Sequence, residues 1–291
     1  MNFRDIKTIV KARKVNMGGF IVDQPLPVDA LDMIDPFLLI HHAEARYEPE
    51  SNVKEVGVGP HPHRGFSPVT MVFQGEVHHR DSRGNSSIVK AGGTQWMNSG
   101  MGVIHSERPS KELAERGGIM EIIQFWVNSP GAFKMRPPEY IPLTADETPV
   151  LMLGDGESKI AVVSGQFENL QGPLKGYSPL LVLRLDLKKG VGKAIHIPSD
   201  FNALIYLLDG NLRINHNSDL FKKQLGLLDS AGEGIYIEAV DSTRAIILAG
   251  KPLNEPVFSH GPFVMNNESQ IMQAMRDYQM GKMGFLVEEF D

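Results

Sequence analysis

Four side chains that could bind a metal ion occur in two pairs, and both pairs have a spacing of two residues. His61 and His63 lie in the segment Pro60-His61-Pro62-His63-Arg64-Gly65-Phe66, and His105 and Glu107 follow later in the chain. Side chains of a β-strand alternate between its two faces, so the members of each pair share a face if both segments are strands. Two such strands held together would direct three imidazoles and one carboxylate at a single metal ion.

This mixed nitrogen and oxygen set suits Fe(II), Mn(II), Ni(II), Co(II), Cu(II) or Zn(II). The chain has no cysteine, so disulfides and thiolate metal sites are excluded. Four protein ligands on an octahedral ion leave two positions, where an oxygen-bearing substrate and O2 could bind side by side.

The other histidines are weaker candidates, because an isolated histidine in a strand is more often structural than a ligand. Adjacent residues of a strand point to opposite faces, so neither the His41-His42 pair nor the His78-His79 pair can chelate as a unit. At most one member of each pair could face the site. The scattered histidines that we do not expect to be ligands are His196, His216 and His260.

Aromatic and amide side chains near the two pairs could line a substrate pocket. Gln124 either points into the barrel and hydrogen-bonds a ligand or substrate, or is a satisfied interior amide. Arg64 is expected to anchor a loop. The candidate pocket residues are Phe66, Phe73, Trp96 and Gln124, and Met97, Phe125 and Trp126 could complete the apolar walls.

Composition narrows the class of protein. The chain has 291 residues, of which 42% are hydrophobic and 22% are charged, as in ordinary globular proteins. The formal net charge of −6 argues against direct contact with nucleic acid, which needs clustered lysine and arginine. No apolar run is long enough to cross a membrane and no secretory signal is visible, so a cytoplasmic location is expected.

Short strand-like segments with a glycine turn about every ten residues predict an all-β sandwich or barrel. A first strand is expected within residues 7–15, followed by a turn at Gly18 and Gly19. The pattern further predicts a hairpin turn over residues 81–86, a charged loop or short helical turn over residues 110–118, and a strand over residues 119–127.

The chain is long enough for two domains. The segment 130–149 contains five prolines and reads as a connection between them. We therefore expect an N-terminal metal-binding barrel over residues 1–135 and a C-terminal barrel over residues 150–291. A weak internal repeat relates His61–Gly75 to His196–Gly210, and Pro198 stands where the first copy has His63, so the second barrel is expected to lack the metal site.

One short helix is expected near residue 270, within the second domain. Asn267 is its predicted N-cap and Gly281 its predicted end. The helix is expected to bury Ile271, Met272 and Met275.

These motifs resemble the pirin family of bicupins. The matching segments are Pro60–Phe66, Gln95-Trp96-Met97, Gly102–Glu107, Gln124–Asn128 and His260–Asn266. The resemblance implies two tandem cupin-type barrels, with metal, typically non-haem iron as Fe(II), held by His61, His63, His105 and Glu107. Where the family commonly has glutamate after Arg-Gly-Phe, this chain has Ser67, which leaves Glu107 as the only well-placed carboxylate.

Some pirins resemble quercetin 2,3-dioxygenases, so the first hypothesis is a metal-dependent oxidoreductase that opens a flavonol-like ring with O2. Its substrates would be a small aromatic molecule and O2, and Glu107 would act as general base if it can swing off the metal. The alternative is a non-enzymatic, metal-binding regulator with a protein partner, as other pirins are linked to transcriptional control. A zinc-dependent isomerase or hydrolase is a third possibility.

Overall fold

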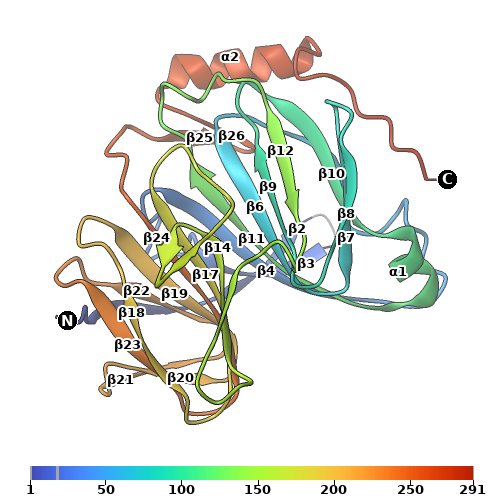
Figure 1. The fold of residues 1–291 in the computed structure, drawn as a ribbon. Coiled ribbons are helices and arrows are strands. Elements are labelled where there is room, and N and C mark those ends of the chain that lie inside the picture. Colours follow the sequence, from blue (N-terminus) through green and yellow to red (C-terminus); the bar gives the residue numbers. More distant parts are fainter. Residues whose placement is uncertain (1, 18–19, 291) are drawn as a thin grey trace. The chain divides into compact units, whose positions relative to one another are not determined.

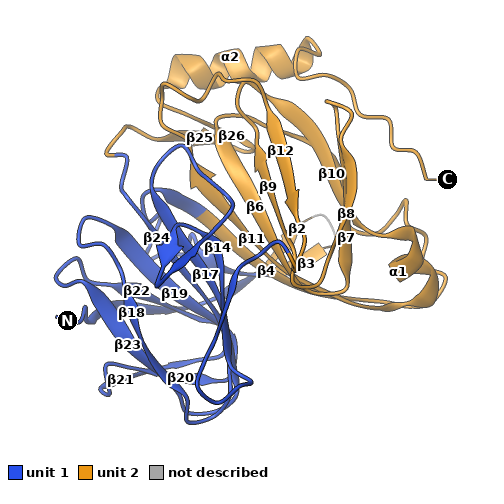
Figure 2. Ribbon diagram, in the orientation of Figure 1, with its two compact units in different colours: residues 1–14, 23–38, 147–253 blue, residues 15–22, 39–146, 254–291 orange. Residues whose placement is uncertain are grey.

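The computed structural model describes residues 2–17 and 20–290. The predicted turn at Gly18 and Gly19 lies outside these residues. The chain divides into two compact units, shown in blue and orange in Figure 2. Unit 1 comprises residues 1–14, 23–38 and 147–253, and unit 2 comprises residues 15–22, 39–146 and 254–291.

Unit 2 contains the histidine motifs and is built on two main sheets (Figure 1). The small sheet is antiparallel, with the order β5 (Val58–His63), β10 (Val103–Pro109), β7 (Glu76–Asp81) and β8 (Ser86–Lys90). The large sheet, composed mostly of unit 2 residues, has the order β12 (Glu139–Leu143), β9 (Thr94–Asn98), β6 (Phe66–Gln74), β11 (Gly118–Asn128), β4 (Phe37–Tyr47), β3 (Phe20–Leu26) and β2 (Arg13–Met17). A short pair, β25 (Phe258–His260) and β26 (Phe263–Met265), accompanies them.

Unit 1 repeats this plan with antiparallel strands. Its large sheet has the order β1 (Ile6–Lys11), β22 (Gln224–Leu228), β19 (Asn202–Asp209), β24 (Thr243–Gly250), β17 (Leu180–Leu187), β14 (Lys159–Ser164) and β13 (Val150–Met152). Its small sheet has the order β18 (Gly192–His196), β23 (Gly234–Ala239), β20 (Asn211–Ile214) and β21 (Ser218–Phe221), and β15 (Gln166–Phe167) pairs with β16 (Leu170–Gln171).

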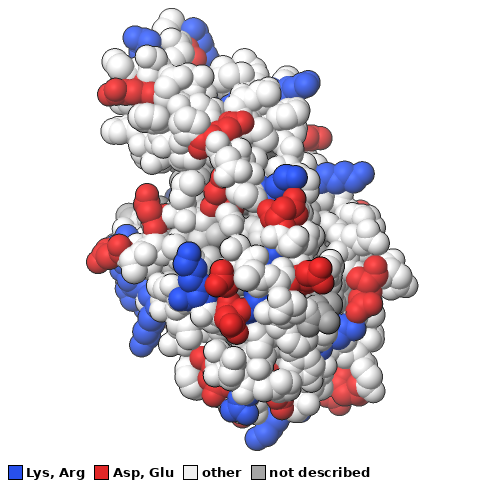
Figure 3. Space-filling model, turned by 90° about the vertical axis from the view of Figure 1, so that its left-hand side faces the viewer, with Lys and Arg blue, Asp and Glu red and all other residues white. Residues whose placement is uncertain are grey.

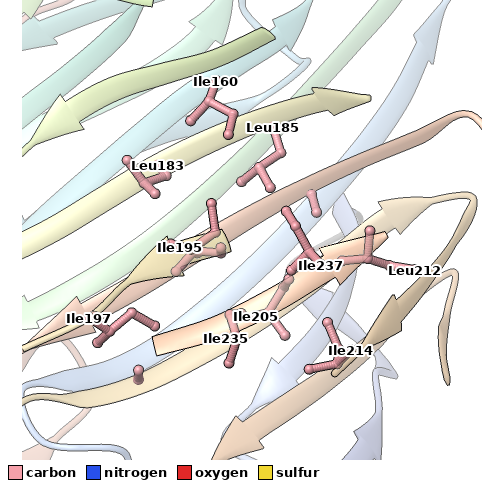
Figure 4. Close-up of a cluster of buried hydrophobic side chains, with 14 of the residues drawn as sticks. Ile160, Leu183, Leu185, Ile195, Ile197, Ile205, Leu212, Ile214, Ile235 and Ile237 are labelled. Carbon is pink, nitrogen blue, oxygen red and sulfur yellow. The ribbon is translucent and has the colours of Figure 1, made fainter. Parts of the chain in front are cut away.

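The interior of unit 1 is filled by aliphatic side chains from both of its main sheets (Figure 4). Ile205 and Leu183 of the large sheet and Ile195 and Ile237 of the small sheet are all almost completely buried in one cluster. Burying such side chains contributes about 1.5–3 kcal/mol each. This packing gives unit 1 a solid apolar core, whereas unit 2 buries histidines and a carboxylate between its sheets.

The all-β prediction, with two barrels and one short C-terminal helix, is confirmed. The hairpin over residues 81–86 joins β7 to β8, and the short turn is helix α1 (Lys111–Arg116), which Ser110 caps by accepting a hydrogen bond from the Leu113 amide. The strand expected over residues 119–127 is β11.

The two compact units are interleaved in sequence, and the predicted domains over residues 1–135 and 150–291 stay a prediction. The first predicted strand is two strands, and β1 pairs with β22 in unit 1 while β2 joins the large sheet with β3. The proline-rich connection itself contains β12, which pairs with β9. Residues 254–291 belong to unit 2. Strand pairing between segments far apart in sequence decides these memberships, and local sequence patterns do not encode it.

Helix α2 (Glu268–Gln279) begins where predicted, because the Asn267 side chain accepts a hydrogen bond from the Gln270 amide. Its buried face contains Ile271 and Ala274, but Met272 is 54% exposed, so the prediction that Met272 is buried was wrong. Residue 272 lies about 100° around the helix from residue 271, which turns it away from the packed face. Among the described residues, no helix has the length and apolarity needed to span a membrane.

Candidate metal centre

The two histidine motifs lie on neighbouring antiparallel strands. In the register of β5 and β10, His61 is opposite His105, and His63 is opposite Val103. Between His105 and Glu107 the register shifts, so that Glu107 pairs with Val58. A β-bulge of this kind re-aims side chains, and such bulges are common near active sites. Strand pairing thus joins the two motifs that are separate in the sequence.

His61, His63 and His105 form a compact group. One ring nitrogen of each lies within 4.8 Å of those of the other two, and the Nε2 atoms of His61 and His105 are 3.0 Å apart. His63 and His105 are almost completely buried. Among the described residues, neither ring nitrogen of His63 has a hydrogen-bond partner of good geometry, although the Pro262 backbone carbonyl interacts with the ring. Buried polar atoms are rarely left unpaired, so this imidazole is suited to a metal ion that supplies the missing partner.

The surroundings of His63 and His105 keep these two rings neutral. Burial lowers the pKa of His63 well below its ordinary value, and the neighbouring His61 lowers it further, while the Pro262 backbone carbonyl acts in the opposite direction. Burial likewise lowers the pKa of His105, as do His61, His63 and His79. A neutral imidazole has the free lone pair that metal ligation needs. The three residues therefore fit a divalent transition metal.

Glu107 is held by hydrogen bonds from three side chains. Its Oε1 accepts from Thr70 Oγ1 at 2.8 Å and from Gln95 Nε2 at 2.5 Å. Its Oε2 accepts from Gln124 Nε2 at 2.6 Å. The Trp126 indole in turn donates to Gln124 Oε1 at 3.3 Å. Gln124 is thus a positioning partner of the carboxylate, and the role of Glu107 as a fourth ligand stays a prediction.

Behind His105 lies a second set of side chains that the motifs did not indicate. The Nδ1 atoms of His105 and His79 are 3.4 Å apart, and His79 Nε2 lies 3.1 Å from Asp81 Oδ2. The Tyr140 ring stacks on His79 with centroids 3.9 Å apart, and its hydroxyl donates to Gln95. Such partners behind a ligand fix the orientation of its ring. The spacing of two residues between His79 and Asp81 is the sequence signal that could have indicated this pair.

The predicted pocket residues separate into two groups. The Phe66 ring lies against His63 at 5.1 Å and stacks on Trp126 at 4.2 Å, which forms an apolar wall beside the histidines. Trp96 follows Gln95 in β9, so alternation places its side chain on the face opposite the Gln95 amide. Phe73 lies where the register between β6 and β11 shifts. Trp96 thus faces away from the Gln95 amide that bonds Glu107, and the pocket role of Phe73 stays a prediction.

The other singled-out residues lie outside the group of three histidines. His42 Nε2 is 3.2 Å from Glu121 Oε1, and His78 Nε2 is 2.9 Å from Ser86 Oγ. Burial lowers the pKa of His41 to about 4. Arg64 anchors the chain as expected, since it donates to the Met101 carbonyl and to the buried Asp277 carboxylate. His196, His216 and His260 are exposed.

Comparison with known proteins agrees with this arrangement. The pirin family model matches residues 19–127, and the model of the pirin C-terminal cupin domain matches residues 182–284. The chain belongs to the pirin family. A pirin-like protein of Caulobacter vibrioides is 34% identical to it, over 97% of this chain and 100% of the relative. A Pseudomonas aeruginosa protein, provisionally named as a quercetin 2,3-dioxygenase, is 36% identical over 86% of each chain.

A solved structure is also closely similar to this pirin. The crystal structure of quercetin 2,3-dioxygenase from Acinetobacter baumannii has a TM-score of 0.92 and 35% sequence identity, and the match covers 98% of this chain and 100% of that one. Both barrels of the pirin are thus cupin barrels.

Acidic and basic side chains are interspersed over the face shown in Figure 3, without a broad region of one sign.

A buried lysine supports the turn that follows His63. Lys134 Nζ donates to the Gly65 carbonyl and to Asn128 Oδ1, both at 2.6 Å, and to the Val264 carbonyl at 3.1 Å. Burial lowers the pKa of Lys134 to about 8, although Glu255 acts in the opposite direction. The ordinary lysine value is 10.5.

This pKa difference predicts a pH-dependent stability. Between about pH 8 and pH 10.5 the unfolded chain holds a proton that the folded protein has released, so raising the pH favours folding. The Lys134 contribution to the free energy of unfolding should rise across this window, with a limiting slope of about 1.4 kcal/mol per pH unit. Urea unfolding from pH 7 to pH 10 measures it, as the difference between the wild type and Lys134→Met. A difference that does not change with pH would contradict the prediction.

Proposed function

We propose that this pirin is a metal-dependent dioxygenase of the quercetin 2,3-dioxygenase type, which opens a flavonol-like ring with O2. The observation that carries the proposal is the group of three histidines, in which buried His63 makes no hydrogen bond of good geometry to any described residue. The close similarity to quercetin 2,3-dioxygenase from Acinetobacter baumannii supports the choice of reaction. His61, His63 and His105 would hold the metal, and Glu107 is proposed as the fourth ligand. We propose Fe(II) as the metal, because the resemblance to the pirin family implies non-haem iron.

Bound there, the metal would polarise the substrate oxygen and supply the redox chemistry for reaction with O2. The protein's own acid–base contribution is assigned to Glu107. The three hydrogen bonds to its carboxylate fix the orientation of both oxygens. A carboxylate held in this way is suited to accept the proton of a flavonol 3-hydroxyl group and to retain it during ring opening.

The apolar wall supports an aromatic substrate. Phe66 is completely buried and Trp126 is partly exposed, and their stacked rings lie next to His63. A flat aromatic molecule could extend this stack while its oxygens point toward the histidines. Excluding water with these rings would also protect the deprotonated substrate from side reactions.

The test is oxygen-dependent loss of flavonol absorbance. Protein freed of metal with a chelator is reconstituted separately with Fe(II), Mn(II), Ni(II), Co(II) or Cu(II), and turnover is compared in air and under anaerobic conditions. We expect turnover with at least one metal in air, with release of carbon monoxide, and none after metal removal.

An absence of O2-dependent turnover with all five metals would reject the dioxygenase proposal. If metal binding persisted in that case, a non-enzymatic metal-binding role would become the leading assignment. Tight binding of zinc, together with turnover that needs no O2, would instead favour an isomerase or hydrolase.

A further inference from the structure

Residues 283–290 form an extended segment, here called the strap, which is attached to the strand that holds His105 and Glu107. Its first attachment is Met283, which is completely buried in a cluster that includes the adjoining Ile104. Ser82 links the two backbones, because its hydroxyl donates to the Met283 carbonyl at 2.7 Å and accepts from the Ile104 amide at 3.1 Å. The strap therefore begins against the residue that precedes His105.

The second attachment is an ion pair at the other end of β10. Arg108 Nε and Nη2 donate to the two carboxylate oxygens of Glu288 at 2.7 and 2.9 Å. Both side chains are nearly buried, at 9% and 8% exposed. A paired, charge-assisted contact of this geometry is among the stronger polar interactions in proteins. Phe290 adds to it, because its ring lies 5.7 Å from the Arg108 guanidinium and 5.0 Å from that of Arg80.

The same arginine also reaches the segment that leads into the other ligand strand. Arg108 Nη1 donates to the Val56 carbonyl at 2.8 Å, two residues before β5 begins. A Cβ at Gly57 would come within 2.7 Å of Arg108 Cα, so the two segments are in close contact. Arg108 thus joins β10, the approach to β5 and the strap at one point.

Alternation along β10 relates these attachments to the site. Ile104 and Arg108 have the same parity and lie on the face opposite His105 and Glu107. The strap is therefore fastened on both sides of the ligand positions, from the outer face of their strand. Between its attachments the strap is loosely packed, since Phe285 is 79% and Val287 84% exposed.

We propose that the strap is a positioning device for the metal centre: its attachment through Glu288 and metal binding by the three histidines favour each other. The physical reason is that both act on the placement of β5 and β10, the strands whose histidines would hold the metal. Such coupling is reciprocal, so whatever factor strap attachment adds to metal affinity, metal adds equally to strap attachment. The inference rests on the metal-binding part of the proposed function and needs no dioxygenase activity.

The first test compares Glu288→Gln with Glu289→Gln, a matched control at the neighbouring exposed glutamate. Ni(II) affinity is measured by competition with a coloured chelator. We expect Glu288→Gln to weaken Ni(II) binding about tenfold, within the range known for residues that orient ligands, and Glu289→Gln to leave it unchanged. A Glu288→Gln protein with lowered stability in urea but wild-type Ni(II) affinity would overturn the proposal.

The second test uses the unaltered protein and measures the effect of the metal on attachment of the strap. Chymotrypsin cleavage after exposed Phe285 is followed by mass spectrometry with and without Ni(II), and cleavage after Phe221 of unit 1, which is 51% exposed, serves as control. We expect Ni(II) to slow cleavage at Phe285 only. Equal cleavage with and without the metal would refute the coupling.

The outcomes separate this inference from the proposed function. Ni(II) binding that depends on Glu288 in a protein without turnover supports the strap and rejects the dioxygenase. Ni(II) binding that is insensitive to Glu288 rejects the strap alone. Failure of the unaltered protein to bind Ni(II) would overturn both.

Discussion

Replacing His63 by leucine is expected to abolish tight metal binding while stabilising the metal-free protein. His63 is almost completely buried, and among the described residues neither of its ring nitrogens has a hydrogen-bond partner of good geometry. A buried, unsatisfied polar group costs about 1–3 kcal/mol, and leucine of similar size removes that cost. The loss of one of three imidazoles should weaken metal binding more than the roughly 10- to 100-fold known for residues behind the ligands.

Two measurements check this prediction. Urea unfolding without metal should show a higher midpoint for His63→Leu than for the wild type, and metal titration should show an affinity loss of more than about 100-fold. His196→Leu, at an exposed histidine in unit 1, should change neither quantity. If His63→Leu destabilised the metal-free protein, the ring would have a structural role, and its unpaired nitrogens would no longer point to a metal.

Replacing Glu107 by glutamine is expected to reduce dioxygenase turnover by about 10²- to 10⁴-fold, the usual contribution of a general base. Glutamine keeps the size of the side chain but cannot accept the substrate proton. Gln95 and Gln124 each donate an N–H to a different Glu107 oxygen. In the glutamine variant, the NH2 group takes the place of one of these oxygens and cannot accept. One of these hydrogen bonds is therefore lost, which costs about 0.5–1.5 kcal/mol of stability.

Steady-state oxygen uptake with a flavonol checks the rate, and unfolding in urea checks the stability. Glu76→Gln is the matched control, because Glu76 is a buried carboxylate of the same unit that pairs instead with Arg116. Its turnover should equal that of the wild type. A Glu107→Gln protein with full turnover would remove Glu107 from the proton transfer and require another base.

How much of this site the sequence could predict depends on how far apart in the chain the interacting residues lie. His61, His63 and His105 could be grouped because a spacing of two fixes the face of a strand, and that local rule held in β5 and β10. Trp96 and Phe73 were chosen by residue type alone; strand alternation places Trp96 on the face opposite Gln95, and the pocket role of Phe73 stays a prediction. The type of a residue does not determine which face of a strand its side chain occupies.

The side chains behind the ligands come from several strands, and this explains why they were missed. Tyr140 lies in β12, within the segment that its prolines suggested was a connection, yet it stacks on His79 of β7. Thr70 and Gln95 converge on Glu107 from β6 and β9. Their meeting depends on how separate sheets pack, which no local pattern specifies. Met272 shows the same limit, since hydrophobic character alone did not reveal which side of α2 faces the protein.

The interleaving of segments between the two units has a consequence for biosynthesis. Strand β1 is made before the other described strands, but its partner β22 leaves the ribosome more than two hundred residues later. The unit that carries the histidines likewise includes residues 254–291, which follow all of unit 1. Domains usually fold one after another during translation, starting from the N-terminus. Here unit 1 cannot be completed before residues 224–253 are made, nor unit 2 before residues 254–290, so strands of both units stay unpaired for much of synthesis.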